Sequence, residues 1–263
     1  MPATVLVPLP DRDFDVTEVA VPWAVLTRAG HEVVFATETG STPAADPRLL
    51  TGVLFGQFGA APDAVAHYRR LEVDPAFRAP LRWPELVAAN YDALLLPGGH
   101  APGMRQYLGS SELRRTVGAF WALDRPVAAI CHGVLVLART ADPSTGRSLL
   151  ATRRTTCLPR YLERTAFLAT AWRLGRYYRT YPAYVQDEVT IALDDPRAQF
   201  VRGPRVLTRR GTDTDDSAAF TVQDGKYLSA RWPGDAYLFA KYLLDLLPPD
   251  RARGAAGARS PGR

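Results

Sequence analysis

Three short, continuously apolar segments constrain the fold of this chain more than any other feature. They are residues 4–8 (Thr-Val-Leu-Val-Pro), 91–97 (Tyr-Asp-Ala-Leu-Leu-Leu-Pro) and 126–130 (Pro-Val-Ala-Ala-Ile). Such runs are typical of parallel strands that helices cover on both faces, because neither face then meets water. Strand and helix patterns alternate along the chain, which favours an α/β domain with a doubly wound, mostly parallel sheet.

The patterns between these segments predict the remaining elements. Asp15 offers an N-cap with Glu18 three residues later, and Gly30 is expected to end the helix that starts there. Residues 31–37 are predicted to form the second strand, completing a right-handed βαβ unit. Further helices are predicted at 111–123, 134–139, 166–177 and 233–247, strands at 188–193 and 201–208, and paired strands at 220–230.

One domain is expected over residues 1–247, since 263 residues with 47% apolar content can bury one large core. Between about 40 and 90, prolines, scattered aromatics and short helical patterns indicate an inserted segment, which we expect to set specificity. Residues 248–263 are mainly Pro, Gly, Ala, Ser and Arg without apolar periodicity, which predicts a disordered basic tail.

Charge and composition argue against several classes of function. The net charge is +5, but residues 250–263 hold four Arg against one Asp, so the rest of the chain is nearly neutral. Basic residues are not interleaved with aromatics in a binding module, so no nucleic-acid partner is expected. The chain shows no charged leader followed by a long apolar segment, which predicts a cytoplasmic protein without a membrane span.

Cys131 stands directly after the third apolar segment, and Gly133 follows two residues later. Glycine permits a tight strand-to-helix turn, which would present Cys131 like a nucleophile elbow with sulfur in place of oxygen. The start of the next helix is then expected to favour thiolate over thiol. The alternative for Cys131 is a small buried hydrophobe. His132 is either a surface imidazole or a proton carrier beside the thiol.

The other chemically capable residues are few. Gly99 ends the second apolar segment, where backbone can approach a ligand closely, and His100 either lines that pocket or lies in a loop. The four histidines show no paired spacing and no cysteine cluster exists, so no metal site is expected. Cys157 is expected to be a packed thiol.

Three motifs in order give this chain a resemblance to a known family. Residues 129–133 (Ala-Ile-Cys-His-Gly), 96–99 (Leu-Pro-Gly-Gly) and 15–18 (Asp-Val-Thr-Glu) together closely resemble the ThiJ/PfpI superfamily. The resemblance covers most of residues 3–247. It implies the flavodoxin-like fold shared with class I glutamine amidotransferases, and self-association into a homodimer.

The same resemblance implies roles for individual residues. Cys131 would be the nucleophile, Glu18 the carboxyl group that touches its sulfur, and the backbone amides of Gly99 and His132 the oxyanion pocket. A carboxyl beside a thiolate is pushed toward its protonated form and can donate a hydrogen bond to sulfur. Glu18 has a plainer alternative role as a capping-box acid.

The catalytic constellation departs from related enzymes in two ways. Members that hydrolyse well are expected to orient the histidine with a third acid some tens of residues downstream, where only Glu163 is a candidate, so a complete triad is in doubt. Glutaminase domains of this type use a histidine far beyond the cysteine, and no histidine follows His132. Glutaminase activity is therefore excluded.

These residues predict a cofactor-independent, cysteine-dependent enzyme acting on a small-molecule substrate. The resemblance points to glyoxalase-like conversion of methylglyoxal to lactate, with hydrolase activity at the same site as a variant. The alternatives are a stress-response protein that senses oxidants or holds unfolded chains, and a catalytically silent member of the fold.

Overall fold

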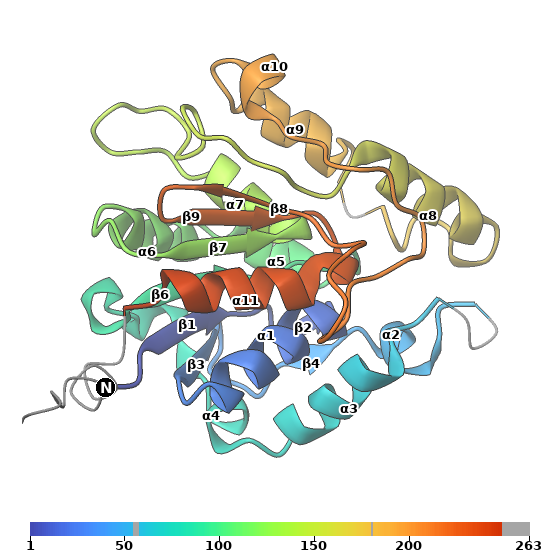
Figure 1. Ribbon diagram of the computed structural model, residues 1–263, viewed down its shortest axis with the longest axis horizontal. Helices are drawn as coiled ribbons and strands as arrows, with labels where there is room; N and C mark the ends of the chain where they lie inside the picture. The colour runs from blue at the N-terminus through green and yellow to red at the C-terminus, as the bar shows by residue number, and fades with distance from the viewer. Residues whose placement is uncertain (55–57, 180, 249–263) are drawn as a thin grey trace, which may run out of the picture.

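The computed structural model describes residues 1–54, 58–179 and 181–248. Its centre is a seven-stranded sheet with the strand order β5 (Leu81–Arg82), β3 (Glu32–Thr37), β1 (Thr4–Pro8), β6 (Ala93–Leu96), β7 (Val127–Ile130), β9 (Tyr227–Ala230) and β8 (Thr221–Asp224). Neighbouring strands are parallel except β8 and β9, which form the predicted antiparallel pair. The mostly parallel α/β sheet expected from the sequence is confirmed (Figure 1).

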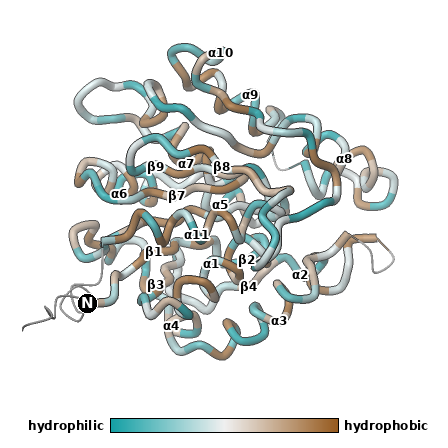
Figure 2. Tube along the Cα trace, in the orientation of Figure 1, coloured by the Kyte–Doolittle hydropathy of each residue, from teal (hydrophilic) through white to brown (hydrophobic). Residues whose placement is uncertain are grey.

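The central strands are buried on both faces, as their apolar sequences predict. Every residue of β6 and β7 is buried, and the two strands pair from Leu94–Val127 to Leu96–Ala129. Figure 2 shows hydrophobic colours along these strands and along α11 (Ala236–Leu246). The carboxyl ends of β1, β6 and β7 therefore meet at one edge of the sheet, which is where a ligand site is expected.

Helices cover the two faces because the chain leaves β1 in one direction and β6 in the other. Helix α1 (Val16–Arg28) connects β1 with β3, whereas α6 (Ser111–Trp121) connects β6 with β7 on the opposite side of β1. Right-handed crossovers in opposite directions place their helices on opposite faces. Helix α11 packs beside α1 in front of the sheet (Figure 1), and Gly30, with φ +86°, ends α1 as predicted.

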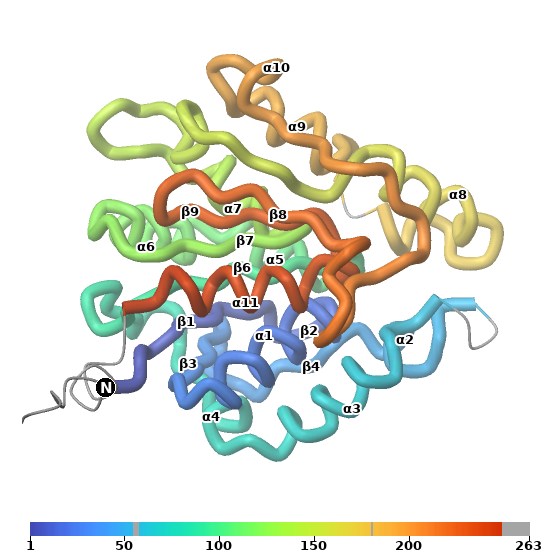
Figure 3. The backbone as a smooth tube through the Cα atoms, viewed as in Figure 1, coloured from blue at the N-terminus to red at the C-terminus, as the bar shows by residue number. Residues whose placement is uncertain are grey.

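Further elements surround this core. They are β2 (Arg12–Phe14), β4 (Ala44–Ala45), α2 (Pro47–Thr51), α3 (Pro62–Leu71), α4 (Pro75–Arg78), α5 (Met104–Gly109), α7 (Val134–Ala138), α8 (Arg160–Leu174), α9 (Val185–Ile191), α10 (Pro196–Gln199) and the 3-10 turns η1 (Trp83–Glu85), η2 (Ala88–Asn90), η3 (Cys131–Gly133) and η4 (Pro233–Asp235). The segment from 40 to 90 contributes α2, α3 and α4 along one side and the edge strand β5. Helices α8, α9 and α10 form an outer layer on the opposite side of the molecule (Figure 3).

Two predicted strands are wrong. Residues 188–193 lie mostly in helix α9, because Val185 and Val189, four residues apart, bury one helical face. Residues 201–208 form irregular chain, since Gly203 and Pro204 interrupt the apolar run. This loop is anchored by the fully buried Arg231, which pairs with Asp235 and donates a hydrogen bond to the Pro204 carbonyl oxygen at 2.6 Å.

The predicted basic tail lies outside the described residues except for Pro248. Among the helices that the structure describes, none combines the length and the apolar character needed to cross a bilayer.

Candidate active site

Cys131 occupies a strained turn at the carboxyl end of β7. Its φ is +58°, a conformation that side-chain-bearing residues rarely adopt, and the chain passes directly into η3 and α7. A Cβ at Gly133 would lie 2.0 Å from the Leu96 carbonyl oxygen, so only glycine fits under the turn. This geometry matches the predicted elbow.

Gly98 brings the end of β6 against this elbow. A Cβ at Gly98 would lie 2.6 Å from the His132 nitrogen and 2.9 Å from Oε2 of Glu18. The Gly98 backbone N–H donates to Glu18 Oε2 at 2.8 Å, and its carbonyl oxygen accepts from the Asp15 N–H at 2.9 Å. The glycine pair therefore allows a close approach between protein segments, which joins the start of α1 to the cysteine turn.

Glu18 is completely buried and faces the cysteine. The side chain of Asp15, and not that of Glu18, caps α1 by accepting from the N–H groups of Thr17 and Glu18. Burial raises the pKa of Glu18 well above its usual value, and the nearby charge of Asp15 raises it further. The hydrogen bond between Glu18 and the Cys131 side chain acts in opposite directions on the two groups, because it lowers the pKa of the carboxyl and raises that of the thiol.

The Cys131 thiol is not activated in the way the sequence predicts. Burial raises its pKa, and the charges of Glu18 and Asp15 raise it further, against a smaller lowering effect from the His132 backbone N–H. Helix α7 has only five residues, so its dipole is a weak counterweight. The resting cysteine is consequently a thiol, and its proton has to leave when the sulfur reacts.

His132 is placed to take that proton. Its Nδ1 lies 3.4 Å from Cys131 Sγ, and the side chain is buried, which rules out a surface imidazole. Burial lowers the pKa of His132 well below 6.5, with His100 and Arg139 adding repulsion. The imidazole is therefore neutral and able to accept a proton at physiological pH.

His100 lines the same site. Its ring centroid lies 4.6 Å from that of His132 in an edge-on arrangement, and 6.0 Å from that of Tyr178. Burial lowers the pKa of His100 to about 4, so this imidazole is also neutral. Donor atoms of His100, Cys131 and His132 all lie within 4.8 Å of one another.

Glu163 does not complete a triad. It lies on α8, where its carboxylate accepts from the Val185 N–H at 2.9 Å and pairs with Arg179 at 3.2 Å. Burial raises the pKa of Glu163 to about 7. Within residues 1–54, 58–179 and 181–248, no carboxylate is hydrogen-bonded to the imidazole of His132. The histidine is oriented by the elbow and by packing against His100.

Two tyrosines that the sequence analysis did not single out adjoin the site, because the ring of Tyr178 packs against His100 and that of Tyr177 against Tyr178. The hydroxyls of Tyr177 and Tyr178 each donate to Asp46 at 3.1 Å, which joins the chain after α8 to the N-cap of α2. Val53 and Leu54 pack with Tyr178. These contacts come from the predicted insertion and from a distant segment, so no local pattern reveals them.

Sequence comparison places these features in a family. The model of the ThiJ/PfpI family-like group matches residues 9–204, which is more than half of the chain. The chain belongs to this ThiJ/PfpI-like family. The recognition made from the three motifs is thereby confirmed.

Relatives of this ThiJ/PfpI-like chain are similar over nearly its full length. The uncharacterized protein C14C4.04 of Schizosaccharomyces pombe is 29% identical over 246 residues, covering 91% of this chain and 82% of that protein. A Pyrococcus abyssi protein named as a deglycase is 26% identical over 234 residues, covering 89% and 93%. The crystal structure of glyoxalase III from Candida albicans has a TM-score of 0.68 at 18% identity, covering 94% and 98%, and supports the fold.

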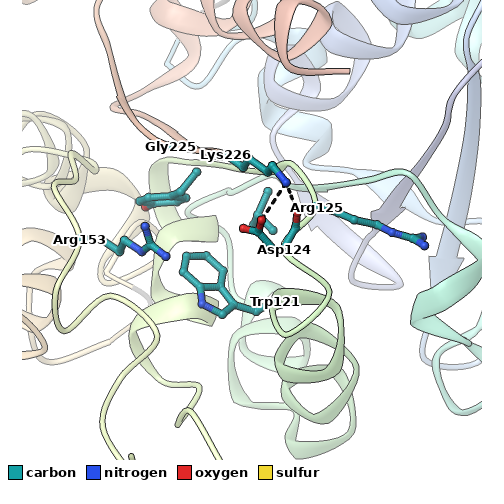
Figure 4. Close-up of a pocket in the computed structure, with 8 residues that line it drawn as sticks. Trp121, Asp124, Arg125, Arg153, Gly225 and Lys226 are labelled. Atoms are coloured by element: carbon teal, nitrogen blue, oxygen red, sulfur yellow. Dashed lines mark hydrogen bonds and ion pairs between the residues drawn. The ribbon is translucent and has the colours of Figure 1, made fainter. Parts of the chain in front are cut away.

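Two hollows in the surface of this family member differ in their relation to the cysteine. One, of about 470 Å³, lies at the carboxyl edge beside the glycine turn and is lined by Asp11, Arg12, Pro102, Gly103 and Gln106. The other, of about 240 Å³, is shown in Figure 4 and is lined by Trp121, Asp124, Arg125, Val127, Arg153, Gly225, Lys226 and Tyr227. Val127 begins β7 and Cys131 follows its end, so the second hollow lies roughly 13 Å away along the strand.

The side chains around the second hollow are largely paired with one another. Lys226 donates to Asp124 at 2.8 Å, and the guanidinium of Arg153 lies 5.4 Å from the ring centroid of Trp121 (Figure 4). This hollow is separate from the thiol site, which is closed because Cys131 and Glu18 have no exposed surface.

Proposed function

We propose that this protein is a cofactor-independent enzyme that uses Cys131 to convert small reactive carbonyls, such as methylglyoxal to lactate. The observation that carries the proposal is the elbow itself, where a buried thiol meets a neutral imidazole and a buried carboxyl group whose pKa is raised. The names of the deglycase and glyoxalase relatives support the same class of reaction.

In the first step the sulfur of Cys131 adds to the aldehyde carbon. The C–S bond forms while the C=O π bond breaks, and the thiol proton passes through His132 to the developing alkoxide, giving a hemithioacetal. The hydrogen bond between Glu18 and the Cys131 thiol in the resting site holds the thiol in its rotamer. The backbone amides of Gly99 and His132 are the proposed donors to the substrate oxygen.

In the second step the hemithioacetal rearranges. His132 removes the proton from the former aldehyde carbon and returns one to the adjacent carbonyl carbon, while the hydroxyl proton of the first carbon passes to the oxygen of the second. The first carbon is thereby oxidised to the thioester carbonyl, and the second is reduced to the alcohol. The product is a thioester of a 2-hydroxy acid, and water cleaves its C–S bond to release lactate and the Cys131 thiol. The redox change is internal to the substrate, so the reaction needs no external oxidant or reductant.

The closed site weakens the main alternative, a redox sensor. A sensor thiol is exposed and has a lowered pKa, whereas Cys131 is fully buried and has a raised pKa. Hydrolase activity uses the same thiol and differs in the electrophile. A silent protein would keep the elbow but show no turnover.

Lactate formation from methylglyoxal by the purified protein, without glutathione, tests this function. Cys131→Ala and His132→Ala should each lower kcat by at least about a thousandfold, because each removes a group from the reacting atoms. Cys157→Ala is the matched control and should stay within a few-fold of the unaltered protein. Absence of turnover in the unaltered protein, or equal loss in all three variants, would overturn the proposal.

A further inference from the structure

The carboxyl edge of the sheet holds a set of donors that the sequence spacing did not predict. His100 follows the turn after β6, whereas Cys131 and His132 follow β7, so two loops bring together one sulfur and two imidazoles. The expectation that this chain has no metal site rested on the absence of paired spacing along the sequence. Parallel strands bring donors together without such spacing, because their carboxyl ends meet at one edge.

We propose that His100, Cys131 and His132 form a binding site for a borderline-soft divalent cation such as Zn²⁺. Thiolate and imidazole are the ligands that Zn²⁺ favours, and three protein ligands with one open position is a common arrangement. Among the residues that the structure describes, this is the group whose donor atoms lie close enough to share one ion.

The distances fit a tetrahedral ion after a small adjustment. With Zn–S of about 2.3 Å and Zn–N of about 2.05 Å, the sulfur and a nitrogen of one site lie roughly 3.5 Å apart. Cys131 Sγ and His132 Nδ1 are 3.4 Å apart. The donor atoms of the full set lie within 4.8 Å of one another, so the longest of their separations has to shorten when the ion binds.

Binding of the ion changes the charge at the Cys131 sulfur. The ion replaces the thiol proton of Cys131, so an S–H bond breaks, an S–metal bond forms and the proton is released to solvent. Each imidazole offers one ring nitrogen as a ligand atom. The buried carboxyl group of Glu18 contacts the Cys131 side chain, so an acidic group adjoins the proposed ligands.

Binding at these donors has a regulatory consequence that rests on the proposed function. A metal ion on Cys131 occupies the electron pair that would attack the carbonyl carbon, and it also occupies the proton carrier His132. We infer that the ion inhibits turnover reversibly and that a chelator restores it. The binding itself does not depend on turnover.

Titration of the metal-free full-length chain with Co²⁺ and then Zn²⁺ tests the site directly. One equivalent of Co²⁺ should give a thiolate charge-transfer band in the near ultraviolet and visible bands of a four-coordinate ion, and Zn²⁺ should displace both. Cys131→Ser should abolish the charge-transfer band, and His100→Gln should weaken binding at least about tenfold. Cys157→Ser is the matched control and should leave the titration unchanged.

The outcomes separate the site from the enzyme. A band that persists in Cys131→Ser, or the absence of a one-to-one complex in the unaltered chain, overturns the metal site whatever the activity. A complex lost in Cys131→Ser but kept in Cys157→Ser supports the site even if no lactate is formed, in which case the proposed function alone fails. If lactate is formed, one equivalent of Zn²⁺ should abolish its production.

Discussion

The two cysteines of this chain are alike in burial and differ in backbone. Cys131 and Cys157 are both free and fully buried, and burial raises the pKa of both thiols. Each also has a buried glutamate whose charge raises the pKa further, Glu18 for Cys131 and Glu163 for Cys157.

The difference lies in what the backbone presents to each sulfur. Cys131 has φ +58° at the end of a central strand, with an imidazole nitrogen at 3.4 Å. Cys157 precedes α8, and its sulfur contacts the carbonyl oxygen of Leu158 at 3.8 Å. Burial and an adjacent acid are therefore common to both, and the strained turn with its proton acceptor is what makes Cys131 the reactive candidate.

Filling the space beneath the Cys131 turn should give the largest effect, because the turn is what distinguishes Cys131 from Cys157. Gly133→Ala places a Cβ against the backbone oxygen of Leu96, which cannot move without distorting β6. We expect a loss of more than about 3 kcal/mol in the free energy of unfolding, measured by urea denaturation. Gly118→Ala in α6 is the control, because its Cβ would meet Thr140 Cγ2 at an ordinary 3.5 Å. That variant should be neutral or up to about 1 kcal/mol more stable, and equal effects would contradict the strained elbow.

Glu163, the acid beside Cys157, should make the free energy of unfolding depend on pH. The pKa of Glu163 is about 7 in the folded protein and 4.5 in an ordinary setting, so between pH 4.5 and 7 the folded state binds more protons than the unfolded state. The contribution of Glu163 to the free energy of unfolding therefore falls as the pH rises from 4.5 to 7, by roughly 3 kcal/mol in total. Glu163→Gln keeps an acceptor for the Val185 N–H but should flatten that part of the curve.

Urea unfolding at several pH values between 4.5 and 8 measures this slope. Glu112→Gln is a control of opposite sign, because Arg115 lowers the pKa of the exposed Glu112 carboxyl. Its removal should leave the fall between pH 4.5 and 7 in place. An unchanged slope in Glu163→Gln would show that the buried ion pair with Arg179 holds this acid ionised.

The elements that follow from a short stretch of sequence are predicted correctly. The continuous apolar runs gave β1, β6 and β7, and the cysteine elbow followed from Gly133. Helix α9 was mistaken for a strand because Val189, Thr190 and Ile191 are β-favouring residues, and β propensity is a weak prior that packing overrides. The four-residue spacing of Val185 and Val189 was the signal that could have identified the helix.

Other features depend on contacts between residues that lie far apart in the sequence. The raised pKa of Cys131 follows from its burial and from the nearby charges of Glu18 and Asp15. From the sequence, Asp15 is predicted only to cap a helix. The distance of Glu163 from Cys131 along the chain made it a candidate for the third acid of a triad, but α8 directs its carboxylate toward Arg179. The pairing of His100 with His132 requires the strand order β6–β7, which three separate apolar runs do not specify.

The smallest expected difference concerns the reactivity of the two thiols toward iodoacetamide. At pH 7.5 both should react more slowly than free cysteine, because burial raises the pKa of each thiol and leaves less thiolate. Cys131 should still react at least about tenfold faster than Cys157, since it adjoins the half-buried His100 whereas the neighbours of Cys157 are buried.

Peptide mass spectrometry of timed samples measures the two rates separately, and the rates should become equal in guanidinium. Because the thiol pKa of Cys131 is raised, its rate should keep rising with pH beyond 9, as the thiolate fraction increases. If Cys131 is labelled faster than free cysteine at pH 7.5, its pKa is lowered. That result would support the alternative function, a redox sensor. Equal rates in the folded protein would mean that the turn does not make the Cys131 sulfur more accessible to the reagent. That result would contradict the proposed difference in reactivity between the two cysteines.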